Sequence, residues 1–136
     1  MNAVDTNILI YVHDSRDPAK QATADALVQS LTSAVLLWQV ACEYIAASRK
    51  LVGSGYSVEM AWQDIRRLQT VWELKLPTLN VLWRADGMMS RYSLSSWDAL
   101  LVAACLEAGV TRLYTEDFDD SVRAEGLEVI NPFANP

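Results

Sequence analysis

The sequence of 136 residues contains only two cysteines and one histidine. Cys42 and Cys105 stand in apolar stretches typical of helices, with no CxxC pattern or nearby histidine, so both are expected to be buried in a protein of a reducing compartment. His13 has no neighbours that would complete a catalytic triad, and a surface or capping role is expected. These shortages argue against a zinc centre, a redox centre and triad chemistry.

Long apolar runs and an excess of positive charge are also missing. No apolar run reaches the roughly 18 residues needed to span a bilayer, and the N-terminus lacks the basic start and cleavage site of a signal peptide. We therefore expect a cytoplasmic protein with no membrane partner. The net charge of −6 argues against a broad basic surface for phosphate backbones. Acids gathered in one cleft and neutralised by divalent cations would still permit a nucleic-acid substrate.

The remaining composition indicates one α/β domain. A chain of this length with 51% hydrophobic residues predicts a single compact domain covering residues 1–136. Short apolar strands alternate with longer amphipathic helices, which predicts a mostly parallel central sheet with helices on both faces. The predicted strands are a segment ending at Val4, residues 34–37, a short stretch within 72–79, and residues 112–115 and 127–130. The predicted helices follow Asp5, Ser57 and Ser95 or cover residues 18–31, 39–52 and 80–92.

Two of these helices show a clear apolar stripe. The 3.6-residue period predicts which side chains face the core. In residues 18–31 the stripe consists of Ala22, Ala26, Leu27 and Leu31. In residues 39–52 it consists of Val40, Tyr44, Ile45, Leu51 and Val52.

Asp5 interrupts the apolar run at residues 3–12. One interpretation is structural: Val4 ends a strand and Asp5 or Thr6 caps the following helix. The other is functional: an acid at the carboxyl end of a buried parallel strand lies where such sheets place their sites. The functional interpretation requires partner residues elsewhere in the chain.

Three further acids recur at comparable positions. Glu43 lies near the start of a predicted helix, where it could favour the helix dipole, and Asp98 has a capping-box spacing from Ser95. Asp117 follows the predicted strand 112–115. Together with Asp5, these acids belong to the edge where parallel strands end and helices begin. Carboxylates at one buried edge repel one another unless a cation holds them, and ligands that are all oxygen suit Mg²⁺ or Mn²⁺.

These segments, taken in order, resemble the PIN-domain family, and in particular the VapC-type toxins of bacterial toxin–antitoxin pairs. The matching segments are residues 4–11 around Asp5, Glu43, residues 94–104 around Asp98, residues 113–118 around Asp117, and residues 131–133. The resemblance covers the whole chain. Ser121 departs from it, because the family favours glycine there, and this leaves the conformation of the loop after Asp117 open.

The resemblance implies a PIN-like three-layer α/β fold and a Mg²⁺-dependent ribonuclease, with Mn²⁺ as a substitute. Asp5, Glu43, Asp98 and Asp117 would hold one or two ions and cleave RNA phosphodiesters. Side chains expected to orient water or phosphate are Thr6, Asn7 and Thr115. Asp119 or Asp120 would be a further ligand or a surface acid, the latter being the commoner role for acids in a loop.

The resemblance also implies partners. A type II toxin has a cognate antitoxin, expected to lay an amphipathic helix or strand in an apolar groove near the acids, with an arginine reaching them. A homodimer is expected as well, because five tryptophans, among them Trp62, Trp72 and Trp83, exceed what one small core readily buries. Two alternatives stay open: a PIN-fold nuclease of RNA processing outside a toxin pair, and a catalytically inactive PIN-fold binding module. The intact acids argue against the second.

Overall fold

The computed structural model describes residues 1–134, so the last two residues of the predicted domain 1–136 lie outside the description. Five short strands all pair in parallel. They are β1 (Asn2–Val4), β2 (Val35–Leu37), β3 (Glu73–Lys75), β4 (Arg112–Tyr114) and β5 (Glu128–Ile130). One set has the order β1-β4-β5, the other pairs β2 with β3, and a parallel bridge between Asn2 and Ala34 joins them. The strands therefore follow the spatial order β5-β4-β1-β2-β3, as a parallel α/β sheet requires.

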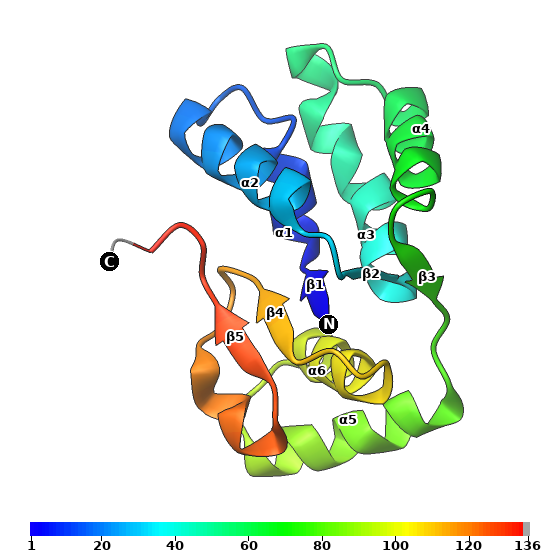
Figure 1. The fold of residues 1–136 in the computed structure, drawn as a ribbon, viewed down its shortest axis with the longest axis vertical. Coiled ribbons are helices and arrows are strands. Elements are labelled where there is room, and N and C mark those ends of the chain that lie inside the picture. Colours follow the sequence, from blue (N-terminus) through cyan, green and yellow to red (C-terminus); the bar gives the residue numbers. More distant parts are fainter. Residues whose placement is uncertain (135–136) are drawn as a thin grey trace.

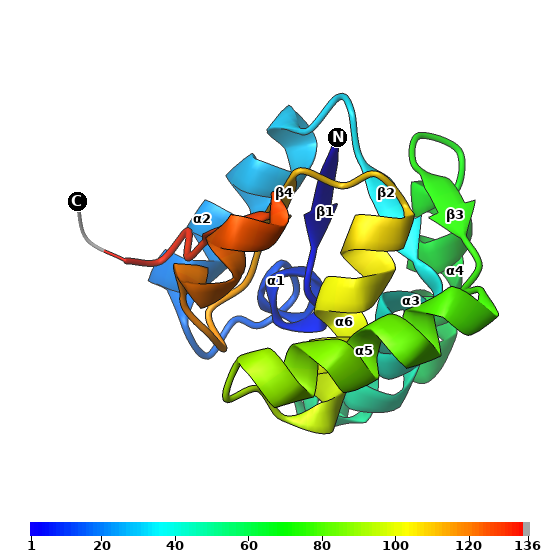
Figure 2. The same cartoon turned by 90° about the horizontal axis from the view of Figure 1, so that it is seen from below.

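Helices cover both faces of these strands, which confirms the predicted PIN-like three-layer fold. Figure 1 shows α5 and α6 packed together below the strands, with α1 to α4 above them. Figure 2, seen from below, places α5 and α6 in front. Within residues 1–134 no helix is long and apolar enough to cross a membrane. The helices are α1 (Thr6–Tyr11), α2 (Pro18–Ser30), α3 (Trp38–Ala47), α4 (Val58–Leu68), α5 (Leu79–Arg91) and α6 (Ser96–Glu107), with 3₁₀ turns η1 (Ser48–Ser54) and η2 (Asp120–Glu125).

Several helices begin and end at the capping residues that the sequence predicted. The Ser57 side chain accepts a hydrogen bond from the Met60 backbone at the start of α4, and Ser95 accepts one from the Asp98 backbone at the start of α6. Such N-caps satisfy backbone donors that a helix leaves unpaired. Gly109 follows α6 with φ +75°, a left-handed conformation that glycine adopts without steric cost.

The core lies between the strands and the helices around them. All three residues of β2 are buried, and α6 buries side chains on several sides, as expected for a helix inside the fold. Trp72 is also part of this core, with 2% of its surface exposed and its indole N–H donating to the Leu31 carbonyl at 3.4 Å. Of the five tryptophans, Trp72 is therefore one that the core does bury.

The buried face of α2 differs from the predicted stripe. Ala24 is the buried residue of this helix, and Leu27, Val28 and Leu31 pack against the core beside it. Ala22 and Ala26, which the prediction placed inside, are exposed. Both stripes satisfy the helical period and share Leu27 and Leu31; Val28, which is larger than Ala22 or Ala26, favours the observed face because it buries more apolar surface.

The helix predicted for residues 39–52 changes character partway. The α-helix ends at Ala47 and continues as η1, with three residues per turn in place of 3.6. The tighter winding leaves Leu51 fully buried and Val52 54% exposed, although both were predicted to be inside. Cys42 is exposed because α3 turns the face with Val40, Ala41 and Tyr44 to the core, whereas Cys105 is buried as predicted.

Replacing these two neighbouring residues by alanine tests the break in the helix. Leu51→Ala should lower the free energy of unfolding by about 2–5 kcal/mol, because it leaves a cavity in the core. Val52→Ala should lower it by less than about 0.5 kcal/mol, as at other exposed positions. Urea unfolding followed by circular dichroism measures both. Equal losses at the two positions would show that the helix continues regularly to Val52.

Candidate active site

Four acids from separate elements line one cavity at the carboxyl ends of the strands. Asp5 follows β1, Glu43 lies on α3 directly after β2, Asp98 lies in the first turn of α6, and Asp117 follows β4. The cavity has a volume of about 340 Å³ and is completed by Gln39, Trp97 and Leu101. The structure thus brings together all four acids that the sequence singled out.

Asp5 is both a helix cap and a wall of this cavity. Its carboxylate is 6% exposed and accepts two hydrogen bonds of 2.7 Å, from the Thr6 backbone to Oδ1 and from the Thr115 hydroxyl to Oδ2. Its own backbone N–H donates to the Tyr114 carbonyl at 2.9 Å, which continues the β1–β4 pairing. The capping interpretation of Asp5 is therefore confirmed, and it does not compete with a role in the cavity.

Burial and like charges shift the protonation of these acids. Burial raises the pKa of Asp5 to about 6, against the hydrogen bonds from Thr115 and Thr6, and the charges of Asp117 and Glu43 raise it further. The pKa of Asp98 is also raised, first by burial and then by the charges of Asp117 and Glu43, while its hydrogen bond with Ser95 lowers it. The charges of Asp117 and Glu43 thus act on both Asp5 and Asp98.

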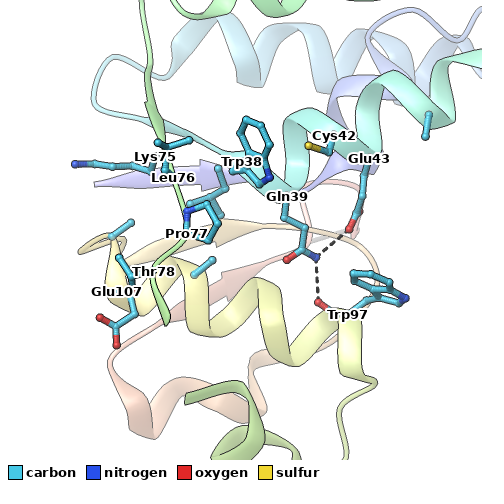
Figure 3. A pocket seen from close by; sticks show the side chains of 14 residues that line it. Trp38, Gln39, Cys42, Glu43, Lys75, Leu76, Pro77, Thr78, Trp97 and Glu107 are labelled. Carbon is cyan, nitrogen blue, oxygen red and sulfur yellow. Dashed lines mark hydrogen bonds between the residues drawn. The ribbon is translucent and has the colours of Figure 1, made fainter. Parts of the chain in front are cut away.

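Glu43 is held from two sides. Thr6 donates its hydroxyl to Glu43 Oε2 at 3.1 Å, and Gln39 donates its amide to Oε1 at 2.9 Å. The same Gln39 nitrogen donates to the Trp97 carbonyl at 3.2 Å, so its side chain lies between α3 and α6 (Figure 3). Sequence reasoning missed Gln39, although its spacing of four residues from Glu43 on one helix is the usual sign of such a contact.

The three expected orienting residues have different surroundings. Thr6 contacts both Glu43 and Asp5. Thr115 connects two acids, because its hydroxyl donates to Asp5 and accepts a 3.1 Å hydrogen bond from the Asp117 backbone. Asn7 does not line the cavity. Its two side-chain polar atoms are buried and have no hydrogen-bond partner among residues 1–134.

The loop after Asp117 is fixed by its own contacts. Asp119 caps η2 by accepting from the Ser121 backbone at 3.0 Å, and Asp120 accepts from the Val129 backbone at 2.9 Å. Neither acid lines the cavity. Asp119 is exposed and Asp120 half-buried in the loop, and both accept hydrogen bonds from nearby backbone groups. Ser121 does not have a positive φ, and the loop therefore makes no demand for glycine there.

A second group of contacts holds the chain beside Asp117. Tyr11 and Lys20 donate to the two oxygens of Glu116, at 2.6 and 2.8 Å, and Lys20 also lies over the Tyr11 ring. This cluster ties α1 and α2 to the segment after β4. It neutralises Glu116 outside the cavity, so the positive charge of Lys20 does not reduce the negative charge within it.

The donor atoms of the cavity fit a hard divalent cation. Its polar lining consists of four carboxylates and one amide, with no nitrogen or sulfur ligand of the kind that zinc prefers. Across residues 1–134, no three acidic, histidine or cysteine side chains stand close enough to hold one ion as they are. Mutual repulsion favours such spacing, so binding an ion requires Asp98 or Asp117 to move toward Asp5 and Glu43, whose carboxylates are held by hydrogen bonds at both oxygens.

Several solved structures share the fold of this chain. No curated protein matches it. Solved structures with the same fold include a toxin–antitoxin complex from Klebsiella pneumoniae, with 19% identity, a TM-score of 0.70 and coverage of 98% of each chain. VapC20 of Mycobacterium tuberculosis, described as a sarcin–ricin loop cleaving toxin, has 20% identity, a TM-score of 0.69 and coverage of 93% of this chain and 96% of that one. FitAcB from Neisseria gonorrhoeae has 16% identity, a TM-score of 0.68 and coverage of 98% and 99%.

At these identities the structural likeness establishes the fold and no activity. The family is established by sequence comparison. The family model of the PIN domain matches residues 3–125, a range that covers nearly the whole chain and includes all four acids of the cavity. The chain therefore belongs to the PIN-domain family.

Proposed function

We propose that this protein is a metal-dependent ribonuclease and the toxin of a type II toxin–antitoxin pair. The observation that carries the proposal is the cavity lined by Asp5, Glu43, Asp98 and Asp117, which come from four separate elements of the fold. A stable fold has no need for four acids around one cavity, where they repel one another. Structural neighbours described as toxins or toxin–antitoxin complexes support the toxin assignment.

Each acid has a defined part in this proposal. Asp5, Glu43, Asp98 and Asp117 would hold Mg²⁺, with Mn²⁺ as a substitute, because hard cations prefer carboxylate oxygens. When bound, Mg²⁺ makes water a better nucleophile and stabilises negative charge on the phosphoryl group. Thr6 and Thr115 fix the carboxylates of Glu43 and Asp5 by donating their hydroxyls to them. Asn7 would orient a water or a phosphate oxygen only after its buried amide turned toward the cavity, which it does not line.

An apolar groove beside the acids suits the proposed antitoxin. It has a volume of about 670 Å³, is lined mainly by apolar side chains such as Leu76 and Pro77, and shares Gln39, Glu43 and Trp97 with the acidic cavity (Figure 3). A segment lying there would bring an arginine to the carboxylates, which a guanidinium can pair bidentately. The antitoxin would then inhibit cleavage by occupying the place of the cation.

Exposed tryptophans support the proposed homodimer. Trp62, Trp83 and Trp97 are 50%, 63% and 66% exposed, and aromatic side chains of this size are enriched at interfaces. With Trp72 buried in the core, these residues and Trp38 account for all the other tryptophans of the chain. Their exposure costs solvation free energy that a second copy would recover.

Replacing Asp98 separates metal binding from helix capping. In EDTA, Asp98→Asn should be at least as stable as the parent, because it removes one charge from a crowded group and Ser95 still caps α6. At a Mn²⁺ or Mg²⁺ concentration of about a hundredfold over Kd, the parent should gain about 2.7 kcal/mol and the variant much less. Thermal unfolding across a metal series measures the gain, and cleavage of a panel of structured RNAs should fall in parallel.

The matched control is Asp86→Asn, an exposed aspartate on α5 that does not line the cavity. It should respond to metal as the parent does. If metal raises the midpoints of the parent and Asp98→Asn equally, or cleavage persists in EDTA, Asp98 is a structural residue and the proposed chemistry is wrong. A protein that binds metal without cleaving RNA would support the binding module instead.

The raised pKa of Asp5 predicts how metal-free stability changes with pH. Because the pKa is about 6 in the folded state against 3.8 for a free side chain, the folded state binds the proton more tightly. This stability is fully present below pH 3.8 and is lost as pH rises through about 6. At about 1.4 kcal/mol per pKa unit, the loss is about 3 kcal/mol.

Asp5→Asn, which is neutral at every pH, is the reference for this effect. In EDTA, the free energy of unfolding of the parent should fall relative to that of Asp5→Asn between about pH 4 and pH 7. Urea unfolding at pH 4, 5, 6 and 7 measures the difference. Parallel curves for the two proteins would mean that Asp5 ionises normally in the fold.

Light scattering tests the proposed homodimer directly. Light scattering of the purified chain at concentrations well above micromolar should give twice the mass of one chain, because association covers the exposed tryptophans. Trp83→Ala on α5 and Trp62→Ala on α4 show which helix carries the interface, since removing a buried aromatic anchor weakens association most. A monomer at every concentration would contradict the proposal.

A further inference from the structure

The side chain of Gln39 bridges α3 and α6, a contact that helix capping does not explain. Gln39 lies in the first turn of α3 and is half-buried, with its amide between two helices. Both hydrogens of its Nε2 are used, one toward Glu43 Oε1 at 2.9 Å and one toward the Trp97 carbonyl at 3.2 Å (Figure 3). The residue lines both the acidic cavity and the apolar groove beside it.

The contact with Trp97 matters because Trp97 directly precedes Asp98 in the chain. Both residues belong to the first turn of α6. One amide group therefore connects the side chain of Glu43 to the turn that carries Asp98. These two acids lie on different helices, 55 positions apart in the sequence, and no covalent constraint sets their separation.

Among residues 1–134, the other hydrogen bond to the Glu43 carboxylate comes from Thr6, at Oε2. With donors on both oxygens, its carboxylate is fixed in orientation toward the cavity. Both donors are neutral. A lysine or arginine at position 39 would orient Glu43 equally well but would place a positive charge where a cation has to bind, whereas an amide orients the carboxylate and leaves its charge intact.

We propose that Gln39 is a positioning residue that holds Glu43 and the first turn of α6 in the arrangement needed to bind a divalent cation. The inference rests on the proposed function, because it assumes that Glu43 and Asp98 bind the metal. Many metal ligands accept a hydrogen bond from, or donate one to, a residue that does not itself bind the metal. Removing such a hydrogen bond commonly lowers metal affinity by about 10- to 100-fold.

Two substitutions at this position separate shape from hydrogen bonding. Gln39→Met keeps an unbranched side chain of similar length and removes the donor. Gln39→Asn keeps the amide but shortens the side chain by one methylene, so it cannot bridge the same two acceptors. The control is Gln29→Met on α2, where Gln29 likewise donates to an acid four residues away, Asp25, but outside the cavity.

The measurement is thermal unfolding of each protein in EDTA and across a Mn²⁺ series. Gln39→Met should need about tenfold more Mn²⁺ than the parent to reach the same rise in midpoint, at the lower end of such effects, and Gln29→Met should match the parent. Gln39→Asn should resemble Gln39→Met. A lower midpoint in EDTA with an unchanged Mn²⁺ dependence would show a purely structural role and overturn the proposal.

A double variant tests whether Gln39 acts through Glu43. In a Glu43→Gln background, adding Gln39→Met should change the Mn²⁺ concentration that gives the same rise in midpoint by less than about twofold, because the residue that Gln39 positions is already altered. A further tenfold change would show that Gln39 does not act through Glu43. If Mn²⁺ fails to stabilise the parent itself, the metal-dependent function falls; if the parent and Gln39→Met respond identically, only the role of Gln39 falls.

Discussion

Parallel pairing of β1 with β4 is the constraint on which the acidic cavity depends. The register places Val4 opposite Tyr114, so that Asp5 and Thr115 leave the two strands side by side. The Asp5 backbone then donates to the Tyr114 carbonyl, and its carboxylate accepts from the Thr115 hydroxyl. An antiparallel pair would send these residues to opposite ends of the sheet. Because β2 is parallel as well, α3 begins at the same edge and brings Glu43 to it.

This edge combines a high density of acids with neutral donors. Asp5 and Glu43 are held by the hydroxyls of Thr6 and Thr115 and the amide of Gln39, none of which carries a charge. The cations nearby are used elsewhere, as Lys20 is by Glu116. Burial of carboxylates without a charged partner is unfavourable, and the raised pKa of Asp5 reflects that cost. The balance suits a site completed by a cation.

Capping and chemistry are compatible at this edge because both use the same geometry. A residue that caps a helix after a parallel strand lies at the carboxyl end of that strand, where the sites of such sheets are found. Asp5 does both by accepting hydrogen bonds at each oxygen while facing the cavity. Asp98 differs, since Ser95 provides the cap of α6, and burial raises the pKa of the Asp98 carboxyl group. Of the two acids, only Asp5 caps its own helix, so Asp98 contributes less to the fold.

Features set by contacts within a few residues were predictable from the sequence. The alternation of strands and helices, the caps Ser57 and Ser95, and the glycine that ends α6 all follow from local backbone chemistry. The convergence of the four acids followed from that alternation, because parallel strands share one carboxyl edge.

The tertiary structure decided what depends on neighbours distant in sequence. The helical period allowed more than one buried face for α2, and packing against the core selected the face of Ala24. Packing likewise buried Trp72 and exposed Cys42. The contact of Gln39 with Trp97 joins residues 58 positions apart, and such a bond exists only once α3 and α6 have met. Local propensity determines which elements form; only their packing determines which faces and which side chains meet.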